Sequence, residues 1–183
     1  TFLSAASNVP EFKLEATYSR NIKNAIEFGT PYNVTKFYDS LKALAEDRTI
    51  DAVYIASPNA FHCSQAIQMM KAGKHVLCEK SLASNKKEAE EMFRTAAENN
   101  VILLEAMRPV FDPGMDAVKA SLNKLGVIRR ATLNYCQYSS RYDSFLQGQE
   151  HNIFSRECSA GALMDIGTYC VHSLLCLFGR PQK

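Results

Sequence analysis

The last predicted helix, Ala160 to Phe178, carries three ionisable side chains on one face. Asp165, Tyr169 and His172 are spaced i, i+4 and i+7, and residues with this spacing lie above one another along an α-helix. A carboxylate, a phenol and an imidazole on an otherwise apolar helix are typical of an acid–base site. The alternative at this point is structural, with Tyr169 packed and the other two in local caps or pairs.

Two buried strands end in polar residues. Ile50 to Ser57 and His75 to Cys78 are nearly continuous apolar runs, as in parallel strands covered on both faces. Ligands of open parallel sheets bind beyond the carboxyl ends of the strands, so the residues there are candidate site residues. They are Ser57, Pro58, Asn59 and His62 after the first strand and Glu79, Lys80 and Ser81 after the second. A strand-end ion pair without a catalytic role is the alternative for Glu79 and Lys80.

The first hundred residues alternate between strand-like and helix-like patterns. Further strands are predicted at Phe12–Ser19, Val34–Phe37 and Val101–Ala106, and helices at Asn21–Phe28, Ser40–Ala45, Ala60–Ala72 and Lys86–Asn99. The predicted N-caps are Asp39 or Ser40, Asn59, and Asn85 with Glu88, and the predicted helix ends are Gly29 and Gly73. This alternation implies right-handed βαβ units and a parallel sheet.

The pattern changes near Arg108. A helix is predicted at Pro113–Lys124 and a polar loop at Ser139–Glu150. Between them, apolar and polar residues alternate over Ile128–Tyr138, which predicts a strand of an antiparallel sheet. We therefore predict an α/β domain over residues 1–107 and an α+β domain with a mainly antiparallel sheet over residues 108–183.

The amino-acid composition argues against several classes of function. The chain has 183 residues, 46% of them hydrophobic, and 21 basic against 19 acidic residues, so neither nucleic acid nor an acidic membrane is expected as a partner. No apolar run has the length that a bilayer requires. The cysteines fit no zinc or iron–sulfur spacing, no histidine pair has ligand spacing, and no metal site is predicted. Free cysteines among apolar neighbours favour a reducing, cytoplasmic compartment.

Four sequence blocks together resemble the glucose–fructose oxidoreductase / inositol dehydrogenase (Gfo/Idh/MocA) family. They are Ala16–Arg20 (ATYSR), Asp51–Asn59 (DAVYIASPN) with His62, Ala72–Lys80 (AGKHVLCEK) and Gly161–Tyr169 (GALMDIGTY). The blocks occur in the family's order and cover most of the chain. Tyr169, where many members have histidine, resembles the branch that contains dimeric dihydrodiol dehydrogenase.

The resemblance implies an NAD(P)-dependent oxidoreductase with a Rossmann domain, an α+β domain and a homodimeric or larger assembly. Such an enzyme transfers a hydride between nicotinamide and a carbinol or carbonyl carbon of a small sugar, polyol or diol. Lys80 matches the family's catalytic lysine, Tyr169 its acid–base residue, and Asp165 would hold Lys80 or a substrate hydroxyl. The nicotinamide would lie near Ser57, Pro58, Asn59, His62, Glu79 and Lys80, and His172 would orient the substrate.

The chain departs from the family in three places. The opening strand and Gly-x-Gly-x-x-Gly turn are absent, so we expect a fragment whose sheet has a central gap and whose second domain stops before most of its sheet. Ser81 stands where the family has a proline after a cis bond, so Lys80 is expected to be placed differently. Ser159–Ala160 replaces a more glycine-rich stretch, and a stiffer loop is expected.

Cofactor choice depends on the end of the predicted strand at Phe12–Ser19. NAD-specific folds place an acid there to bind the ribose hydroxyls, whereas this chain reads Tyr18-Ser19-Arg20-Asn21. Ser19 can hydrogen-bond a 2′-phosphate and Arg20 can pair with it or stack over it. The sequence therefore favours NADP, with NAD as the alternative cofactor. The alternative interpretation of Arg20 is that it is an ordinary surface residue.

Two other function classes stay open. A non-catalytic dinucleotide-binding sensor or scaffold would retain the fold without bringing Lys80 and Tyr169 to one substrate oxygen. A flavodoxin-like regulatory domain is disfavoured by the α+β second half and by the absence of an acidic pocket. The loop from Tyr138 to Ile153 is expected to contribute to substrate specificity.

Overall fold

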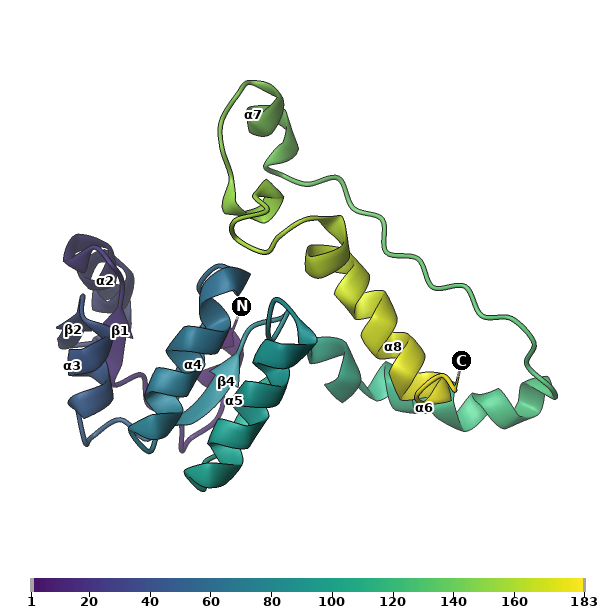
Figure 1. Ribbon diagram of the computed structural model, residues 1–183, viewed down its shortest axis with the longest axis horizontal. Coiled ribbons are helices and arrows are strands. Elements are labelled where there is room, and N and C mark those ends of the chain that lie inside the picture. Colours follow the sequence, from purple (N-terminus) through teal and green to yellow (C-terminus); the bar gives the residue numbers. More distant parts are fainter. Residues whose placement is uncertain (1, 183) are drawn as a thin grey trace.

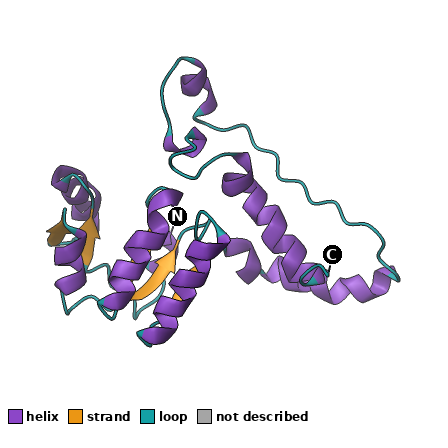
Figure 2. Ribbon diagram, viewed as in Figure 1, coloured by secondary structure: helices purple, strands orange, loops and turns teal. Residues whose placement is uncertain are grey.

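The computed structural model describes residues 2–182, and its N-terminal half is built on parallel strands (Figures 1 and 2). β1 (Ala16–Tyr18) pairs with β2 (Lys36–Tyr38), while β3 (Ala52–Ile55), β4 (His75–Cys78) and β5 (Leu103–Glu105) form a second sheet in the order β3-β4-β5. All pairings are parallel. The predicted parallel α/β architecture is confirmed, and within the described residues it is divided into two sheets, in agreement with the expected central gap.

Register brings the strand ends of the larger sheet together. Ile55 is paired with Cys78, and Cys78 with Glu105, so β3, β4 and β5 end at one edge of the sheet. The residues that follow these strands therefore lie side by side, as parallel topology requires.

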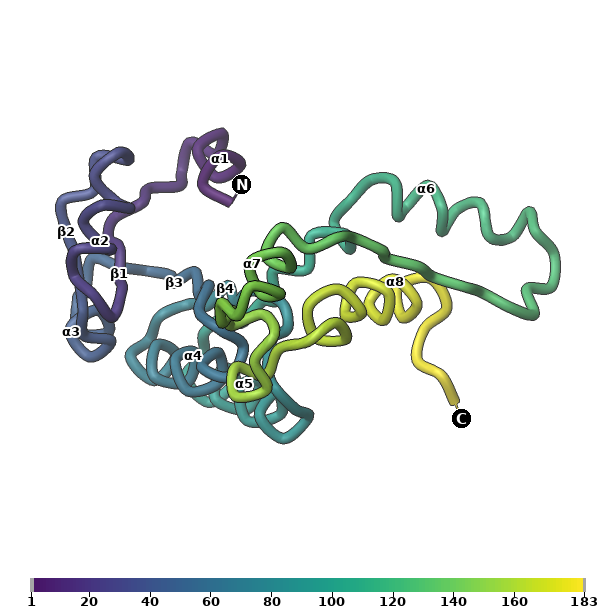
Figure 3. The backbone as a smooth tube through the Cα atoms, turned by 90° about the horizontal axis from the view of Figure 1, so that it is seen from above, coloured from purple at the N-terminus to yellow at the C-terminus, as the bar shows by residue number. Residues whose placement is uncertain are grey.

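Among the described residues 2–107 the α-helices are α1 (Phe2–Ala6), α2 (Ile22–Gly29), α3 (Leu41–Glu46), α4 (His62–Lys71) and α5 (Lys86–Glu98). α4 and α5 lie side by side against the larger sheet (Figures 1 and 3). Their apolar faces bury Met69, Met70 and Met92 completely in the main core. The ring of Phe2 stacks on Tyr54 of β3, with centroids 4.0 Å apart.

Local capping explains most of the helix boundaries. The side chains of Asn21, Ser40 and Asn85 accept backbone N–H groups at the starts of α2, α3 and α5. Gly73, with φ +77°, ends α4 as predicted. Gly29 is the last residue of α2, and a Cβ atom there would lie 2.6 Å from Thr17 Oγ1.

The predicted cap at Asn59 is wrong. A 3₁₀ turn, Asn59–Phe61, precedes α4, and no side chain caps it. The side chain of Asn59 instead donates to the carbonyl oxygen of Ser159, because this turn faces the second half of the chain.

The second half is mainly helical. α6 (Pro113–Ser121) is followed by a 3₁₀ turn, Leu122–Leu125, and α7 (Tyr142–Leu146) lies in the predicted polar loop. The last helix begins with a π-helical turn, Leu163–Gly167, and continues as α8 (Thr168–Phe178). Two 3₁₀ turns, Arg108–Phe111 and Asn152–Phe154, complete this half, and α8 packs beside the first. None of the described helices is long and apolar enough to cross a bilayer.

The strand predicted at Ile128–Tyr138 is not formed. The chain between α6 and α7 is extended but has no strand partner among residues 2–182, so the predicted antiparallel sheet is not seen there (Figure 1). A strand exists only through hydrogen bonds to a neighbour, and alternation alone does not supply that neighbour. Within this segment Tyr135 packs on Tyr169, with ring centroids 5.3 Å apart.

Candidate active site

Lys80 joins the end of β4 to the last helix. Its ammonium group donates to Asp165 Oδ1 at 2.6 Å and to the Asp165 carbonyl oxygen at 2.7 Å. The Lys80 side chain is 17% exposed and that of Asp165 is 30% exposed, so the ion pair is largely shielded from water. The Lys80–Ser81 peptide bond is cis, and the Ser81 hydroxyl donates to the Met164 carbonyl oxygen at 2.9 Å.

Tyr169 lies in the same cluster. The Lys80 Nζ atom is 5.3 Å from the centroid of the Tyr169 ring, a cation–π contact. Asp165 lies one helical turn before Tyr169, which places both side chains on the face toward Lys80. The structure thus brings together the three residues predicted to be catalytic, and two of the three Lys80 N–H groups are used by Asp165.

Glu79 is oriented by the neighbouring strand. Its carboxylate accepts the Tyr54 hydroxyl of β3 and the backbone N–H of Lys80, the latter at 3.3 Å. Burial, followed by the hydrogen bond to Glu79, raises the pKa of Tyr54 above its ordinary range, so this phenol stays protonated and donates. Glu79 therefore lies at the strand ends next to Lys80, as expected.

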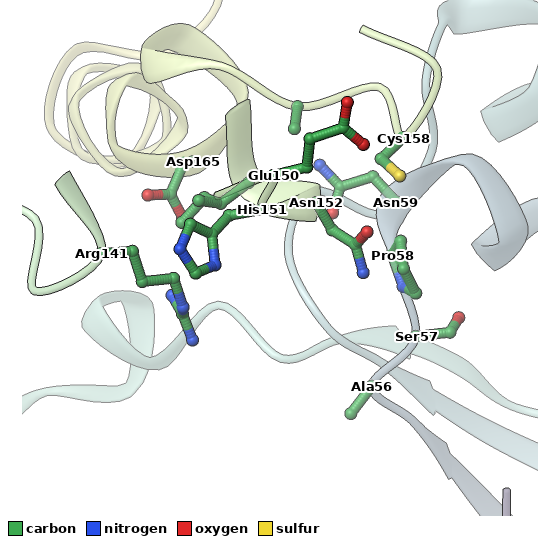
Figure 4. A pocket seen from close by; sticks show the side chains of 12 residues that line it. Ala56, Ser57, Pro58, Asn59, Arg141, Glu150, His151, Asn152, Cys158 and Asp165 are labelled. Carbon is green, nitrogen blue, oxygen red and sulfur yellow. The ribbon is translucent and has the colours of Figure 1, made fainter. Parts of the chain in front are cut away.

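A cavity of about 430 Å³ opens between the strand ends and the second half of the chain (Figure 4). Of the predicted site residues, Ser57, Pro58, Asn59 and Asp165 line it. Glu79, Lys80 and Tyr169 lie outside the lining, and Lys80 reaches it through its ion pair with Asp165. The other lining residues with polar or sulfur side chains are not among the predicted site residues; they are Arg141, Glu150, His151, Asn152 and Cys158. Most of these come from the loop expected to contribute to specificity. Figure 4 shows His151 and Asn152 between Arg141 on one side and Pro58 on the other.

Two hydrogen bonds hold the cavity walls together. Asn59 Nδ2 donates to the Ser159 carbonyl oxygen at 2.9 Å, and the Ala60 backbone N–H donates to the Cys158 carbonyl oxygen at 3.2 Å. The Ser57 hydroxyl donates to Gln65 Oε1 of α4 at 2.8 Å. The turn after β3 is therefore fixed both to its own helix and to the segment that leads to Asp165.

His62, expected near the cofactor, lies beneath the strand ends. Its side chain is completely buried, and its ring nitrogens lie 2.8 Å from the carbonyl oxygens of Ser57 and Ser81. Both ring nitrogens are thus occupied by the chain itself. The structure gives His62 the role of a bridge between the two strand-end loops and leaves it out of the cavity lining.

Ser19 and Arg20 follow β1 in the smaller sheet. The Ser19 hydroxyl oxygen accepts the Asn21 backbone N–H at 3.4 Å. The Arg20 guanidinium lies 5.7 Å from the centroid of the Phe61 ring, in the turn after β3. Arg20 therefore reaches from one sheet to the strand-end edge of the other and is held there by an aromatic face.

His172 does not line the cavity. Its Nε2 atom lies 2.9 Å from Glu105 Oε2 at the end of β5. Glu105 is not among the predicted site residues, although it shows the same sequence signal as Glu79, an acid at the carboxyl end of an apolar strand. Helix spacing alone predicts His172 as a site residue, and spacing cannot identify the partner that a side chain contacts.

These features define a class of protein. Parallel strands with covering helices and polar groups at their carboxyl ends form a Rossmann-type nucleotide-binding fold, whose strands lie here in two separate sheets among the described residues. Residues 1–107 match the family described as "Oxidoreductase family, NAD-binding Rossmann fold" (GFO_IDH_MocA). The chain belongs to this Gfo/Idh/MocA family.

The relatives are named dehydrogenases and oxidoreductases. The chain is 49% identical over 181 residues to scyllo-inositol 2-dehydrogenase (NADP(+)) IolU of Bacillus subtilis, covering 99% of this chain and 55% of the relative. It is 31% identical to trans-1,2-dihydrobenzene-1,2-diol dehydrogenase of Mus musculus, covering 100% of this chain and 54% of that protein. The chain thus spans about half the length of the curated relatives it matches.

A solved structure is similar across both halves of the chain. KijD10, a 3-ketoreductase from Actinomadura kijaniata in complex with NADP and TDP-benzene, superposes with a TM-score of 0.77 at 27% identity. The match covers 97% of this chain and 53% of KijD10. The similarity therefore extends beyond residue 107 to the segment that carries Asp165 and Tyr169.

Proposed function

We propose that the protein containing this chain is an NADP-dependent oxidoreductase acting on a small sugar, polyol or diol. The observation that carries the proposal is the convergence of Lys80, Asp165 and Tyr169 at the carboxyl ends of parallel strands. The alternative for Lys80, a strand-end ion pair without a catalytic role, gives no reason for the Tyr169 phenol to lie beside it. The names of the relatives support the same reaction class.

Tyr169 is the proposed general acid–base group. Its hydroxyl gives a proton to the substrate oxygen in reduction and takes one in oxidation. The ammonium group of Lys80 near the ring stabilises negative charge on the phenolic oxygen while the proton moves. Tyr135, stacked on the same ring, limits the ring's orientations.

Lys80 is proposed to donate a hydrogen bond to the substrate oxygen. Asp165 holds two of its N–H groups, which leaves the third to donate to a hydroxyl or carbonyl oxygen. Because the ammonium is fixed before the substrate binds, little reorganisation is needed during the reaction. Asp165 therefore acts by holding Lys80 in place.

The strand-end residues fit NADP. Pro58, Asn59 and Glu79 follow the ends of β3 and β4, where the nicotinamide end would bind, while Ser19 and Arg20 provide a hydroxyl and a guanidinium for a 2′-phosphate. The segment after β1 contains no carboxylate that would repel that phosphate. When bound, NADP supplies or accepts the hydride, and NAD is the alternative cofactor.

The cavity lining favours a neutral, polyhydroxylated substrate. Arg141, His151 and Asn152 provide hydrogen-bond donors, and Glu150 provides an acceptor. A polyol needs both kinds of partner. A carboxylate substrate would instead meet Glu150 and Asp165 in the same cavity.

The proposal also covers the domain division, the cellular location and the oligomeric state. We infer two domains, residues 1–107 and 108–183, because the parallel α/β pattern ends after β5. A cytoplasmic location is supported by the six cysteines, all free thiols. A homodimer or larger homo-oligomer is inferred from the family resemblance.

The test is cofactor binding by the full-length protein, followed by turnover. Titration with NADPH and with NADH, monitored by nicotinamide fluorescence, should give the lower Kd for NADPH. A panel containing scyllo-inositol, other inositols and trans-diols should then yield NADP-dependent activity. Binding without turnover on any such compound would favour a dinucleotide-binding sensor. Binding of neither cofactor would favour a scaffold.

A further inference from the structure

Glu105 contacts two segments that carry proposed catalytic residues. Its Oε1 atom accepts the Leu82 backbone N–H at 2.8 Å, and its Oε2 atom lies 2.9 Å from His172 Nε2. Leu82 lies two residues after Lys80 in the loop that follows β4. His172 lies three residues after Tyr169 on α8. One carboxylate therefore links the Lys80 loop to the Tyr169 helix.

The environment of Glu105 makes both contacts significant. Its side chain is 16% exposed and that of His172 is 34% exposed. A carboxylate shielded to this degree is costly unless its oxygens have hydrogen-bond partners, and each oxygen has one. Glu105 is also fixed from below, because it is the last residue of β5 and pairs in register with Cys78 of β4.

The Glu105–His172 contact holds the helix on the C-terminal side of Tyr169, whereas the contacts of Lys80 and Ser81 hold it on the N-terminal side. Lys80 binds Asp165 and Ser81 binds Met164, both before Tyr169 in the helix. His172 comes one turn after Tyr169. A helix held at one point can still rotate or tilt, whereas two points on either side of Tyr169 fix its rotation.

We propose that Glu105 and His172 form a clamp that positions Tyr169 relative to Lys80. Glu105 is thus a positioning residue for the oxidoreductase reaction, and the inference rests on the proposed function. His172, expected to orient the substrate, acts through the helix instead. The clamp works by keeping the phenol and the ammonium group within reach of one substrate oxygen.

The test uses the full-length protein with NADP and scyllo-inositol, or the active compound from the substrate panel. We expect Glu105→Ala and His172→Phe each to lower kcat on the order of 10- to 100-fold, since a displacement of about 1 Å can cost that much. The Kd for NADPH should stay within about twofold. Glu105→Gln should recover most of kcat, because its amide can accept from Leu82 and donate to His172.

A double variant and a matched control sharpen the result. If both residues act through one contact, Glu105→Ala with His172→Phe should be no slower than the slower single variant. Glu98→Ala, an exposed acid at the end of α5, should leave kcat unchanged. Strictly multiplicative losses, or kcat retained by both single variants, would overturn the clamp.

Hydrogen exchange separates failure of the clamp from failure of the proposed function. The measurement compares the amide exchange rates of Glu105 and His172 variants that have the same Tm as the wild type. His172→Phe should raise amide exchange in the first turns of α8, and Glu105→Ala should raise it there and at Leu82, whose hydrogen-bond acceptor it removes. Glu105→Gln should raise neither. This holds even if no substrate is turned over. Unchanged exchange at both places would contradict the proposal, as would loss of NADPH affinity in parallel with kcat.

Discussion

The ammonium group of Lys80 lies 2.6 Å from the carboxylate of Asp165, a residue 85 positions further along the chain. The first comes from a strand end of the nucleotide-binding fold and the second from the helix that carries Tyr169. The ion pair therefore joins the two halves of the chain at the point where the proposed chemistry takes place. Because both side chains are largely shielded, removal of one partner leaves a poorly solvated charge.

Lys80→Met should abolish the pairing while keeping much of the side-chain volume. We expect kcat to fall by about 100-fold or more, since a preorganised donor to the substrate oxygen is lost. Asp165→Asn should cost less, because the amide oxygen and the backbone carbonyl still accept from Lys80. Steady-state kinetics of the two variants check the order. A larger loss in Asp165→Asn than in Lys80→Met would contradict the assigned roles.

Tyr169→Phe should remove the proposed acid–base group alone. We expect turnover to fall by roughly 10²- to 10⁴-fold with the Kd for NADPH unchanged. Tyr32→Phe, which alters an exposed tyrosine, is the matched control and should behave like the wild type. Fluorescence titration and initial rates measure both quantities. Retained activity in Tyr169→Phe would rule out the phenol as the proton donor.

Arg20→Ala should weaken NADPH binding selectively. A charge-assisted contact to the 2′-phosphate contributes about 1.5–3 kcal/mol, so the Kd for NADPH should rise about 10- to 100-fold. The Kd for NADH should change little, because NADH has no 2′-phosphate. Arg94→Ala on α5 controls for the loss of one positive charge. An equal loss of affinity for both cofactors would indicate that Arg20 supports the fold through Phe61.

Asp47 should make the smaller sheet sensitive to acid. The backbone N–H and then the hydroxyl of Thr49, with Tyr38 and Lys36, hold the pKa of Asp47 well below its ordinary value. A carboxyl group with a lowered folded-state pKa contributes stability above its unfolded pKa and loses it as pH falls through the folded value. The loss should therefore begin below about pH 4.

Thermal melting at pH 7 and pH 3 checks this prediction. Asp47→Asn should lower the Tm at pH 7 and show a smaller further decrease at pH 3 than the wild type. Asp51→Asn alters an exposed acid just before β3, serves as the control and should follow the wild type at both pH values. A parallel decrease in wild type and Asp47→Asn would argue against the linkage.

Cys78 should resist alkylation in the folded protein. Burial, with smaller contributions from Glu105 and Glu79, raises the pKa of the Cys78 thiol to about 12. Its thiolate fraction at pH 8 is therefore on the order of 10⁻⁴, and the thiol is also sterically protected. The exposed Cys136 should react readily with iodoacetamide. Peptide mass spectrometry before and after urea denaturation distinguishes them, and rapid native labelling of Cys78 would contradict the packing.

Short-range sequence signals were enough to predict the strands and helices of the first half. Runs such as His75–Cys78 and caps such as Ser40 and Asn85 act within a few residues, so their signals lie in adjacent positions. The sequence also indicated Lys80 and Tyr169 as candidates, because a parallel strand ends at the ligand-binding edge and a helix repeats every 3.6 residues.

The partners that these residues contact depend on tertiary packing and could not be predicted from local patterns. His62 and His172 are both polar histidines on helices, yet one is buried between two carbonyl oxygens and the other binds Glu105. Alternation at Ile128–Tyr138 predicted a strand that has no neighbour among the described residues. Strand pairing, ion pairs and cavity walls depend on segments distant in sequence, and the periodicity of one segment carries no information about the other.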